Sequence, residues 1–153
     1  MQSKEKYFVL PNQSLNDIPL DVEHLYFSGY GKQNELTELN FSSCGFSQLK
    51  SITIGNECFK FVRTFLLDGL DQLESVKVGE SCFRYGLHKE EDDDPEDGLF
   101  QITNCPKLCD LEIGYQSFDD YRSFVLSNVE SLTSIKFGDE CFYYADHCIL
   151  KGA

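Results

Sequence analysis

The chain has 153 residues, 41% of them hydrophobic and 14% aromatic, so it can bury the core of one domain. This composition excludes an intrinsically disordered chain. The 13 basic and 26 acidic residues give a formal net charge of −13, which argues against nucleic acid and anionic membranes as partners because both are negatively charged.

The amino-terminal segment, residues 1–20, contains an apolar run only at residues 7–10, which is too short for a signal peptide or a membrane span. The chain has seven cysteines, an odd number, which favours free thiols over disulfides. We therefore expect a cytoplasmic location, or an extracellular surface if the chain is a fragment. Residues 1–20, with Pro11 and Pro19, are expected to form a cap or lead-in that shields the first repeat.

The next segment, residues 21–48, contains the sequences VEHLYF and LTELNF. Both have the apolar-x-x-apolar-x-apolar pattern that is typical of a short, half-buried strand. The two patterns begin at Val22 and Leu36, a spacing of 14 residues. This spacing predicts two irregular, compressed repeats.

Residues 49–153 contain four copies of one unit. The segments LKSITIGNECF, LESVKVGESCF, LCDLEIGYQSF and LTSIKFGDECF begin at Leu49, Leu73, Leu108 and Leu132, so the starts are 24, 35 and 24 residues apart. The longer interval equals 24 plus an eleven-residue acidic insertion at 88–98, HKEEDDDPEDG. A repeat in this size range determines the whole architecture.

Each unit begins with a pattern that predicts a strand followed by a sharp corner. Ile52 and Ile54 flank the polar Thr53, which is the period of two expected of a strand near residues 51–54. Glycine follows at once in every unit, where the corner requires either a positive φ or a close backbone approach. These glycines are Gly55, Gly79, Gly114 and Gly138.

The later half of each unit predicts a second strand. An aromatic column, which we assign to the core of the opposite wall, is formed by Phe59, Phe83, Phe118 and Phe142. Alternating inward pairs then follow at Phe65 and Leu67, Phe100 and Ile102, Phe124 and Leu126, and Cys148 and Leu150. No unit can bury its apolar face alone, so the units must stack, about 4.8 Å apart.

The pattern Leu-x-x-Ile-x-Ile-Gly-x-x-Cys-Phe resembles the leucine-rich repeat, in particular its irregular BspA-like class, in which a comparable strand is followed by Ile-Gly-x-x-Ala-Phe. The resemblance covers residues 49–153, with Cys58 at the alanine position. It implies a mainly β, leucine-rich-repeat-like solenoid with coils of about 24 residues and two short parallel strands per coil. The units lack the asparagine that usually follows the strand, so a two-sided β-solenoid is also in keeping with the pattern.

The outward positions of the first strand are the best candidates for function. Repeat solenoids use such regular polar arrays to bind other proteins, although neighbouring charges also stabilise the sheet itself. The candidate partner-binding residues are Ser51, Thr53, Ser75, Lys77, Asp110, Glu112, Ser134 and Lys136. We expect a protein-protein interaction module with no catalytic activity and no cofactor. The alternative is a structural spacer or a segment that assembles end to end, because the last strand is left as an open edge.

Three further features have weaker functional interpretations. The insertion carries seven acidic residues and one lysine, which favours a solvated loop or a recognition element for basic partners over a metal site. Cys58, Cys82 and Cys141 share an inward slot and are expected to act as small hydrophobic residues. The outward column of the second strand is mostly apolar, so it either packs under loops or forms a contact patch. Its members are Leu66, Gln101, Val125 and Ile149.

Metal and nucleophile sites have little support in the sequence. The cysteines that lie close together in sequence do not form the paired CxxC arrangement of a zinc site. They are Cys105 with Cys109, and Cys141 and Cys148 near His147. A cysteine nucleophile would need a histidine base beside it, and nothing in the sequence brings the two together.

Overall fold

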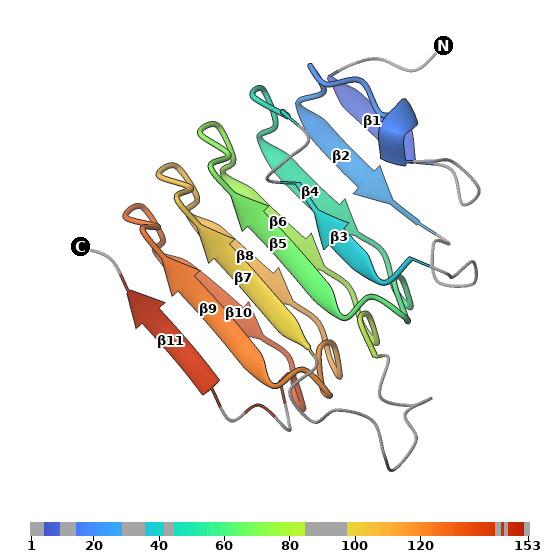
Figure 1. The fold of residues 1–153 in the computed structure, drawn as a ribbon, viewed down its shortest axis with the longest axis vertical. Helices are drawn as coiled ribbons and strands as arrows, with labels where there is room; N and C mark the ends of the chain where they lie inside the picture. The colour runs from blue at the N-terminus through green and yellow to red at the C-terminus, as the bar shows by residue number, and fades with distance from the viewer. Residues whose placement is uncertain are drawn as a thin grey trace.

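The computed structural model describes residues 5–9, 15–28, 36–41, 45–84, 98–142, 145 and 147–151. These residues are mainly β-structure, arranged as two parallel sheets that lie face to face (Figure 1). One short 3-10 helix, η1 (Leu15–Asp17), lies between the first two strands. In the described ranges, no helix is long and apolar enough to cross a lipid bilayer.

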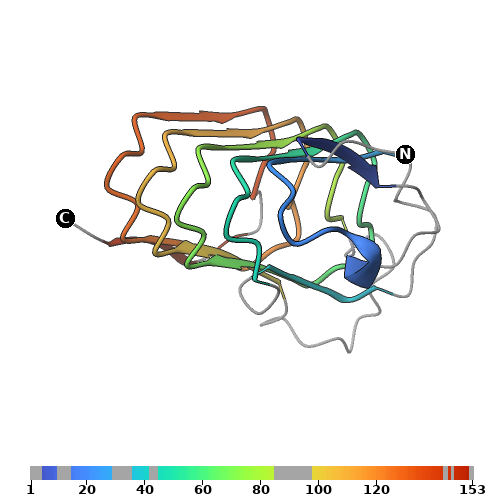
Figure 2. The ribbon, with the colours of Figure 1, turned by 90° about the horizontal axis from the view of Figure 1, so that it is seen from above.

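Successive strands along the chain belong almost alternately to the two sheets. The six-stranded sheet has the order β1 (Lys6–Val9), β2 (His24–Phe27), β4 (Ser51–Ile54), β6 (Ser75–Val78), β8 (Asp110–Ile113) and β10 (Ser134–Phe137). The five-stranded sheet has the order β11 (His147–Lys151), β9 (Ser123–Ser127), β7 (Leu99–Thr103), β5 (Thr64–Asp68) and β3 (Glu38–Asn40). From β2 onward each passage through both sheets makes one circuit, and Figure 2 shows the circuits displaced one after another along the stack.

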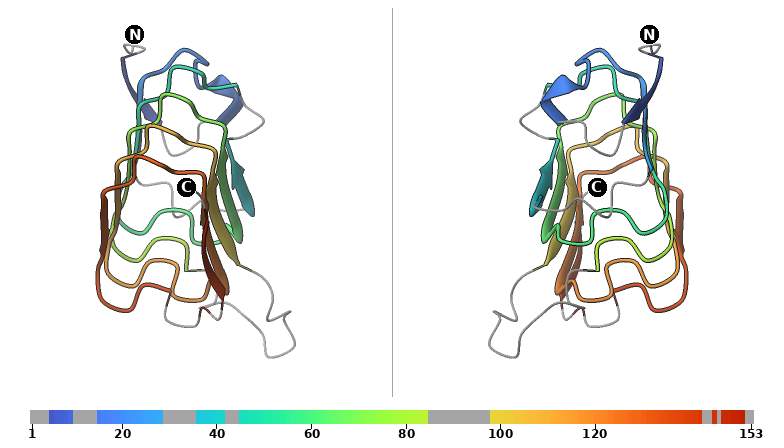
Figure 3. Two further views of the ribbon diagram at one scale, coloured as in Figure 1. Left: turned by 90° about the vertical axis from the view of Figure 1, so that its left-hand side faces the viewer. Right: turned by 90° about the vertical axis from the view of Figure 1, so that its right-hand side faces the viewer.

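The strand register agrees with the alignment of the four units. Ile52 pairs with Val76, Val76 with Leu111, and Leu111 with Ile135. In the other sheet, Phe65 pairs with Phe100. The predicted strand near residues 51–54 and the predicted second strands are therefore confirmed. The eleven extra residues do not shift either sheet, and Figure 3 shows successive circuits with similar outlines.

A ladder of phenylalanine rings runs through the core along the stack. The ring centroids of Phe83 and Phe118 are 4.4 Å apart, with an angle of 8° between the ring planes. Those of Phe118 and Phe142 are 5.1 Å apart, with an interplanar angle of 3°. Rings from the five-stranded sheet insert beside them, with Phe100 4.6 Å from Phe118. The aromatic column was predicted on the opposite wall, but it lies in the connections between the sheets, where its rings contact side chains of both.

At the corners, the glycines of the repeat allow backbone atoms of a neighbouring circuit to approach closely. They do not have positive φ. A Cβ added to Gly114 would lie 2.6 Å from the carbonyl carbon and oxygen of Gly79, so only glycine fits. The left-handed conformation falls instead on Phe118 (φ 58°) and its equivalents in the other units. A left-handed φ is rare for a bulky residue, and the tightly packed rings hold the backbone in that conformation.

One of the two amino-terminal predictions is wrong. VEHLYF forms β2 in the six-stranded sheet and LTELNF forms β3 in the five-stranded sheet, so residues 21–48 contribute the two walls of one circuit and not two compressed repeats. Residues 1–20, expected to form a cap or lead-in, include β1, which pairs with β2 and extends the six-stranded sheet. Ile18 and Val22 are buried against the first circuit.

A second ladder of polar side chains follows the strands of the five-stranded sheet. Asn128 donates a hydrogen bond from Nδ2 to Oδ1 of Asn104 at 2.8 Å, and Asn104 donates from Nδ2 to Oδ1 of Asp68 at 2.9 Å. Both asparagines have positive φ, a conformation that asparagine tolerates better than most residues. The ladder fixes three successive turns to one another.

Candidate functional site

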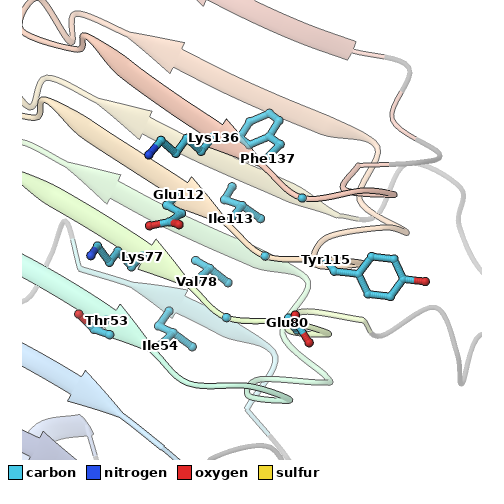
Figure 4. Close-up of a pocket in the computed structure, with 13 residues that line it drawn as sticks. Thr53, Ile54, Lys77, Val78, Glu80, Glu112, Ile113, Tyr115, Lys136 and Phe137 are labelled. Carbon is cyan, nitrogen blue, oxygen red and sulfur yellow. The ribbon is translucent and has the colours of Figure 1, made fainter.

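The outer face of the six-stranded sheet carries all eight candidate partner-binding residues. Strand pairing places Ser51, Ser75, Asp110 and Ser134 in one column and Thr53, Lys77, Glu112 and Lys136 in a second, parallel column. The structure therefore brings together every residue that the repeat alignment selected. Figure 4 shows part of this face, with the side chains of the second column aligned across four strands.

The second column alternates in charge along the stack. Glu112 pairs in register with Lys77 on one side and with Lys136 on the other, and all three side chains are exposed. Such cross-strand neighbours of opposite charge stabilise a sheet by roughly 0.2–1 kcal/mol each. No ion pair within 4.0 Å involves any of the three in the described part of the chain, so their charged groups face solvent.

Two hollows lie along this face and share residues of the charged column. The larger, about 580 Å³, follows the carboxyl-terminal ends of β4, β6, β8 and β10. The smaller, about 210 Å³, is lined by both carboxylates, Asp110 and Glu112, and by both lysines, Lys77 and Lys136. The face is therefore shallowly grooved rather than flat, with its charges along the groove.

The backbone of the glycine column forms the floor of the larger groove. Gly79, Gly114 and Gly138 line it, and each would bring an added Cβ to within 2.6 Å or less of an atom of the preceding unit. The amide nitrogen of each of these glycines donates a hydrogen bond to a carbonyl oxygen of the preceding circuit, so the floor is a strip of paired backbone. The sequence signalled these glycines as corners, but the groove above them was missed.

A tyrosine at the rim of this groove was also missed. Tyr115 is exposed, and the neighbouring carboxylate of Glu140 raises the pKa of its phenol. Gln116 donates a hydrogen bond to Oε2 of Glu140 at 2.6 Å, which holds that carboxylate in place. The units have no aromatic residue in common at this position, so no repeat pattern could have singled it out.

The strand register extends the candidate face toward the amino terminus, to a strand that precedes residue 49. The sequence did not indicate this extension. His24 pairs with Ser51, and its Nδ1 lies 2.7 Å from the hydroxyl oxygen of Ser51. Tyr26 pairs with Thr53, and its ring stacks on that of Phe8, with the ring centroids 4.7 Å apart and an interplanar angle of 17°. The face therefore has an aromatic and imidazole region at the amino-terminal end and a charged region toward the other end.

The inward cysteine slot is more polar than expected. The thiol of Cys82 donates to the carbonyl of Gly55 at 3.0 Å, and that of Cys141 donates to the carbonyl of Gly114 at 2.9 Å. Ser117 fills the slot between them, and its hydroxyl donates to the carbonyl of Gly79 at 2.7 Å. In the last three units the small side chain thus ties its corner to the glycine of the preceding unit.

Burial makes the thiols of Cys82, Cys105 and Cys141 weak nucleophiles. It raises the pKa of Cys82 to about 12 and that of Cys105 to about 11, and it also raises the pKa of Cys141. A thiolate is the reactive form, so these groups are largely unreactive near neutral pH. Cys109 is half-buried, with its thiol 3.3 Å from the carbonyl oxygen of Glu74.

The raised pKa of Cys82 predicts a loss of stability at alkaline pH. Its pKa rises from 9.0 to about 12 on folding, so it stabilises the fold below pH 9, and this contribution disappears as the pH rises toward 12. We expect the free energy of unfolding to fall less steeply above pH 9 in Cys82→Ala than in the wild type, measured by urea denaturation. Cys148→Ala, at an exposed position, should retain the wild-type slope, and equal slopes in all three proteins would contradict the prediction.

The other candidate features receive less structural support as sites. Among the described residues, no three His, Cys, Asp or Glu side chains gather where they could hold a metal ion. In the outward column of the five-stranded sheet, Leu66, Gln101 and Val125 are half-buried and Ile149 is exposed. The acidic residues of the insertion lie outside the described residues.

Comparison with known proteins adds no identification. No family model matches the chain, and the searches of curated proteins and of solved structures found no match.

Proposed function

We propose that this chain is a leucine-rich-repeat-like β-solenoid that binds another protein through the outer face of its six-stranded sheet. The alternation of strands between two parallel sheets, the 24-residue spacing and the one-step register support the solenoid. The alignment of Lys77, Glu112 and Lys136 beside a groove carries the functional proposal, because three exposed charges without ion partners among the described residues are available to a partner.

The mechanism is rigid presentation. Each side chain of the face stands on a strand that is hydrogen-bonded within a sheet, so the backbone does not have to become ordered when the partner binds. The alternating charges select a partner whose charges alternate in the opposite sense.

A non-catalytic role in the cytoplasm is part of the proposal. The six described cysteines are free thiols, as expected in a reducing compartment. The thiols of Cys82 and Cys105 have raised pKa values and are poor nucleophiles. The contact between His24 and Ser51 follows from strand register on an open face and needs no catalytic explanation.

Inverting the charged column should weaken binding without loss of stability. The triple variant Lys77→Glu, Glu112→Lys, Lys136→Glu keeps opposite charges on neighbouring strands but reverses the pattern that a partner meets. We expect its free energy of unfolding to stay within about 0.5 kcal/mol of the wild type. Partner affinity should fall at least about tenfold, measured by affinity capture followed by titration of the captured protein.

The control for this experiment is Lys107→Glu, which changes the same charge type at an exposed turn where the lysine donates a hydrogen bond to Gln72. This variant should capture the same protein as the wild type. A chain without residues 88–98 tests whether the acidic insertion contributes instead. If the triple variant captures the same protein with unchanged affinity, the proposed face is wrong.

A further inference from the structure

A short threonine separates the aromatic region from the charged region on the outer face of the six-stranded sheet. Strand pairing places Tyr26, Thr53 and Lys77 in one column on three neighbouring strands. The tyrosine and lysine side chains extend much further from the sheet than the threonine between them, and Figure 4 shows Thr53 beside the longer Lys77. The column therefore has a gap at Thr53, where the larger groove of this face reaches β4.

One wall of this gap is the ring of Tyr26. This ring stacks on that of Phe8, and the centroid separation of 4.7 Å matches the spacing of about 4.8 Å between strands. The two rings therefore stack along the column, and the second face of Tyr26 is turned toward Thr53. Among the described residues, the ring of Tyr26 has no other stacking partner. The gap thus has an ordered aromatic face on one side.

The adjacent column fills the corresponding position on β4 with its own side chains. His24 and Ser51 are register partners in that column, and Nδ1 of His24 lies 2.7 Å from the hydroxyl oxygen of Ser51. The imidazole is therefore held against the short serine. No such hydrogen bond to Thr53 occurs in the part of the chain that the structure describes, so the position above this threonine is left open.

We propose that this gap binds an aromatic side chain of the partner protein, stacked between the ring of Tyr26 and the ammonium group of Lys77. The proposal rests on the protein-binding function proposed above for the same face. A ring above Thr53 lies one strand spacing, about 4.8 Å, from each neighbour. This distance suits stacking on tyrosine, at centroid separations of roughly 4.5–7 Å, and a cation–π contact with lysine, within about 6 Å.

The two walls select a neutral ring over a charged or aliphatic group. A carboxylate would attract Lys77, but the negative face of the Tyr26 ring would repel it. A guanidinium would stack on that ring, but Lys77 would repel it. An aliphatic side chain gains neither the stacking nor the cation–π contact. A tyrosine or tryptophan ring satisfies both walls and can also contact the methyl group of Thr53.

The next charge along the column specifies a basic group on the same partner. Glu112 pairs in register with Lys77 and is exposed. It lies two strand spacings, about 10 Å, from Thr53. The partner surface therefore presents an aromatic residue and, about 10 Å from it, a lysine or arginine that pairs with Glu112.

Titration of the full chain with short capped peptides, followed by NMR, tests the aromatic site. The probe peptide contains tryptophan and arginine separated by two glycines, which places them about 10 Å apart when extended. Its indole ring current should shift the methyl resonance of Thr53, with a dissociation constant on the order of 1 mM. A peptide with leucine in place of tryptophan has the same charge. It should bind at least about threefold more weakly and should not cause that shift.

Paired variants assign the binding to the gap, with the amide resonance of Lys77 as the common reporter. Tyr26→Leu should weaken binding of the tryptophan peptide about three- to tenfold, whereas Tyr26→Phe keeps the ring and should leave binding unchanged. Thr53→Phe fills the gap and should abolish binding, whereas Thr53→Val should retain it. Both positions are half-buried on the outer face, so all four variants should keep the wild-type circular dichroism spectrum. No detectable binding at about 10 mM peptide, or undiminished binding by Thr53→Phe, would overturn the proposal.

The protein captured in the charge-inversion experiment separates a failure of this site from a failure of the whole face. At least about tenfold weaker binding by both the charge-inverted triple variant and Thr53→Phe supports both proposals. If only the triple variant loses affinity, the face is correct and the aromatic site is wrong. If neither variant loses affinity, the face itself is wrong.

Discussion

Replacing Phe118 by alanine is expected to lower the free energy of unfolding by about 3–5 kcal/mol, the range for removing a fully buried aromatic ring. Phe118 is fully buried and stacks on Phe83, Phe100 and Phe142. Its loss opens a cavity between two circuits, which rigid strands on both sides cannot close. Urea denaturation followed by far-ultraviolet circular dichroism measures the effect.

Two further variants test the reasons for this loss. Phe8→Ala removes an exposed ring that stacks on Tyr26 at the sheet surface, and it should cost less than about 1 kcal/mol. Phe118→Gly tests the backbone, because φ at this position is 58° and glycine adopts that conformation without strain. Glycine should therefore be no worse than alanine here, the reverse of the usual order. A loss of under 1 kcal/mol in Phe118→Ala would contradict the importance of the ring ladder.

Replacing Gly114 by alanine should cost about 1–3 kcal/mol, the usual effect of overpacking. The added methyl group would lie 2.6 Å from the carbonyl of Gly79 and 2.9 Å from the amide nitrogen of Glu80. These are backbone atoms, so relief requires two circuits to move apart and weakens the hydrogen bond from Gly114 N to Val78 O. The same urea denaturation measures the cost.

The equivalent glycine of the first unit provides the control. Among the described residues, the atom nearest to a Cβ at Gly55 would be the carbonyl oxygen of Phe27, at 3.2 Å, so Gly55→Ala should cost roughly 0.5 kcal/mol. If both variants lose the same stability, close approach does not explain the glycine at position 114. The cause would then be a property that all four units share.

Much of the fold could be predicted because one pattern repeats with a clear physical meaning. Alternation of apolar and polar residues fixes which side chains face inward, and the four aligned units fix the register between strands. The positions of Lys77, Glu112 and Lys136 followed directly, since residues aligned in the repeat became neighbours in the sheet. The candidate face was therefore available from spacing alone.

The errors arose where different structures share one pattern. VEHLYF and LTELNF both alternate, because strands of the two walls bury one side in the same way, so a half-circuit was interpreted as a full repeat. The left-handed φ of Phe118 was not predictable, because bulky residues rarely adopt it and tertiary packing imposes it here. Tyr115 was missed since it belongs to no repeated column.

The unbroken pairing of β5 with β7 shows how the architecture separates spacing along the chain from spacing in space. Thr64 and Leu99 are neighbours although their positions are 35 residues apart in sequence, whereas Leu99 and Ser123 are 24 apart. Length changes at such a corner are absorbed outside the sheets, because each strand is positioned by the strand before it. Segments of different length can therefore be accommodated there while the spacing of side chains on the outer face of the six-stranded sheet stays constant.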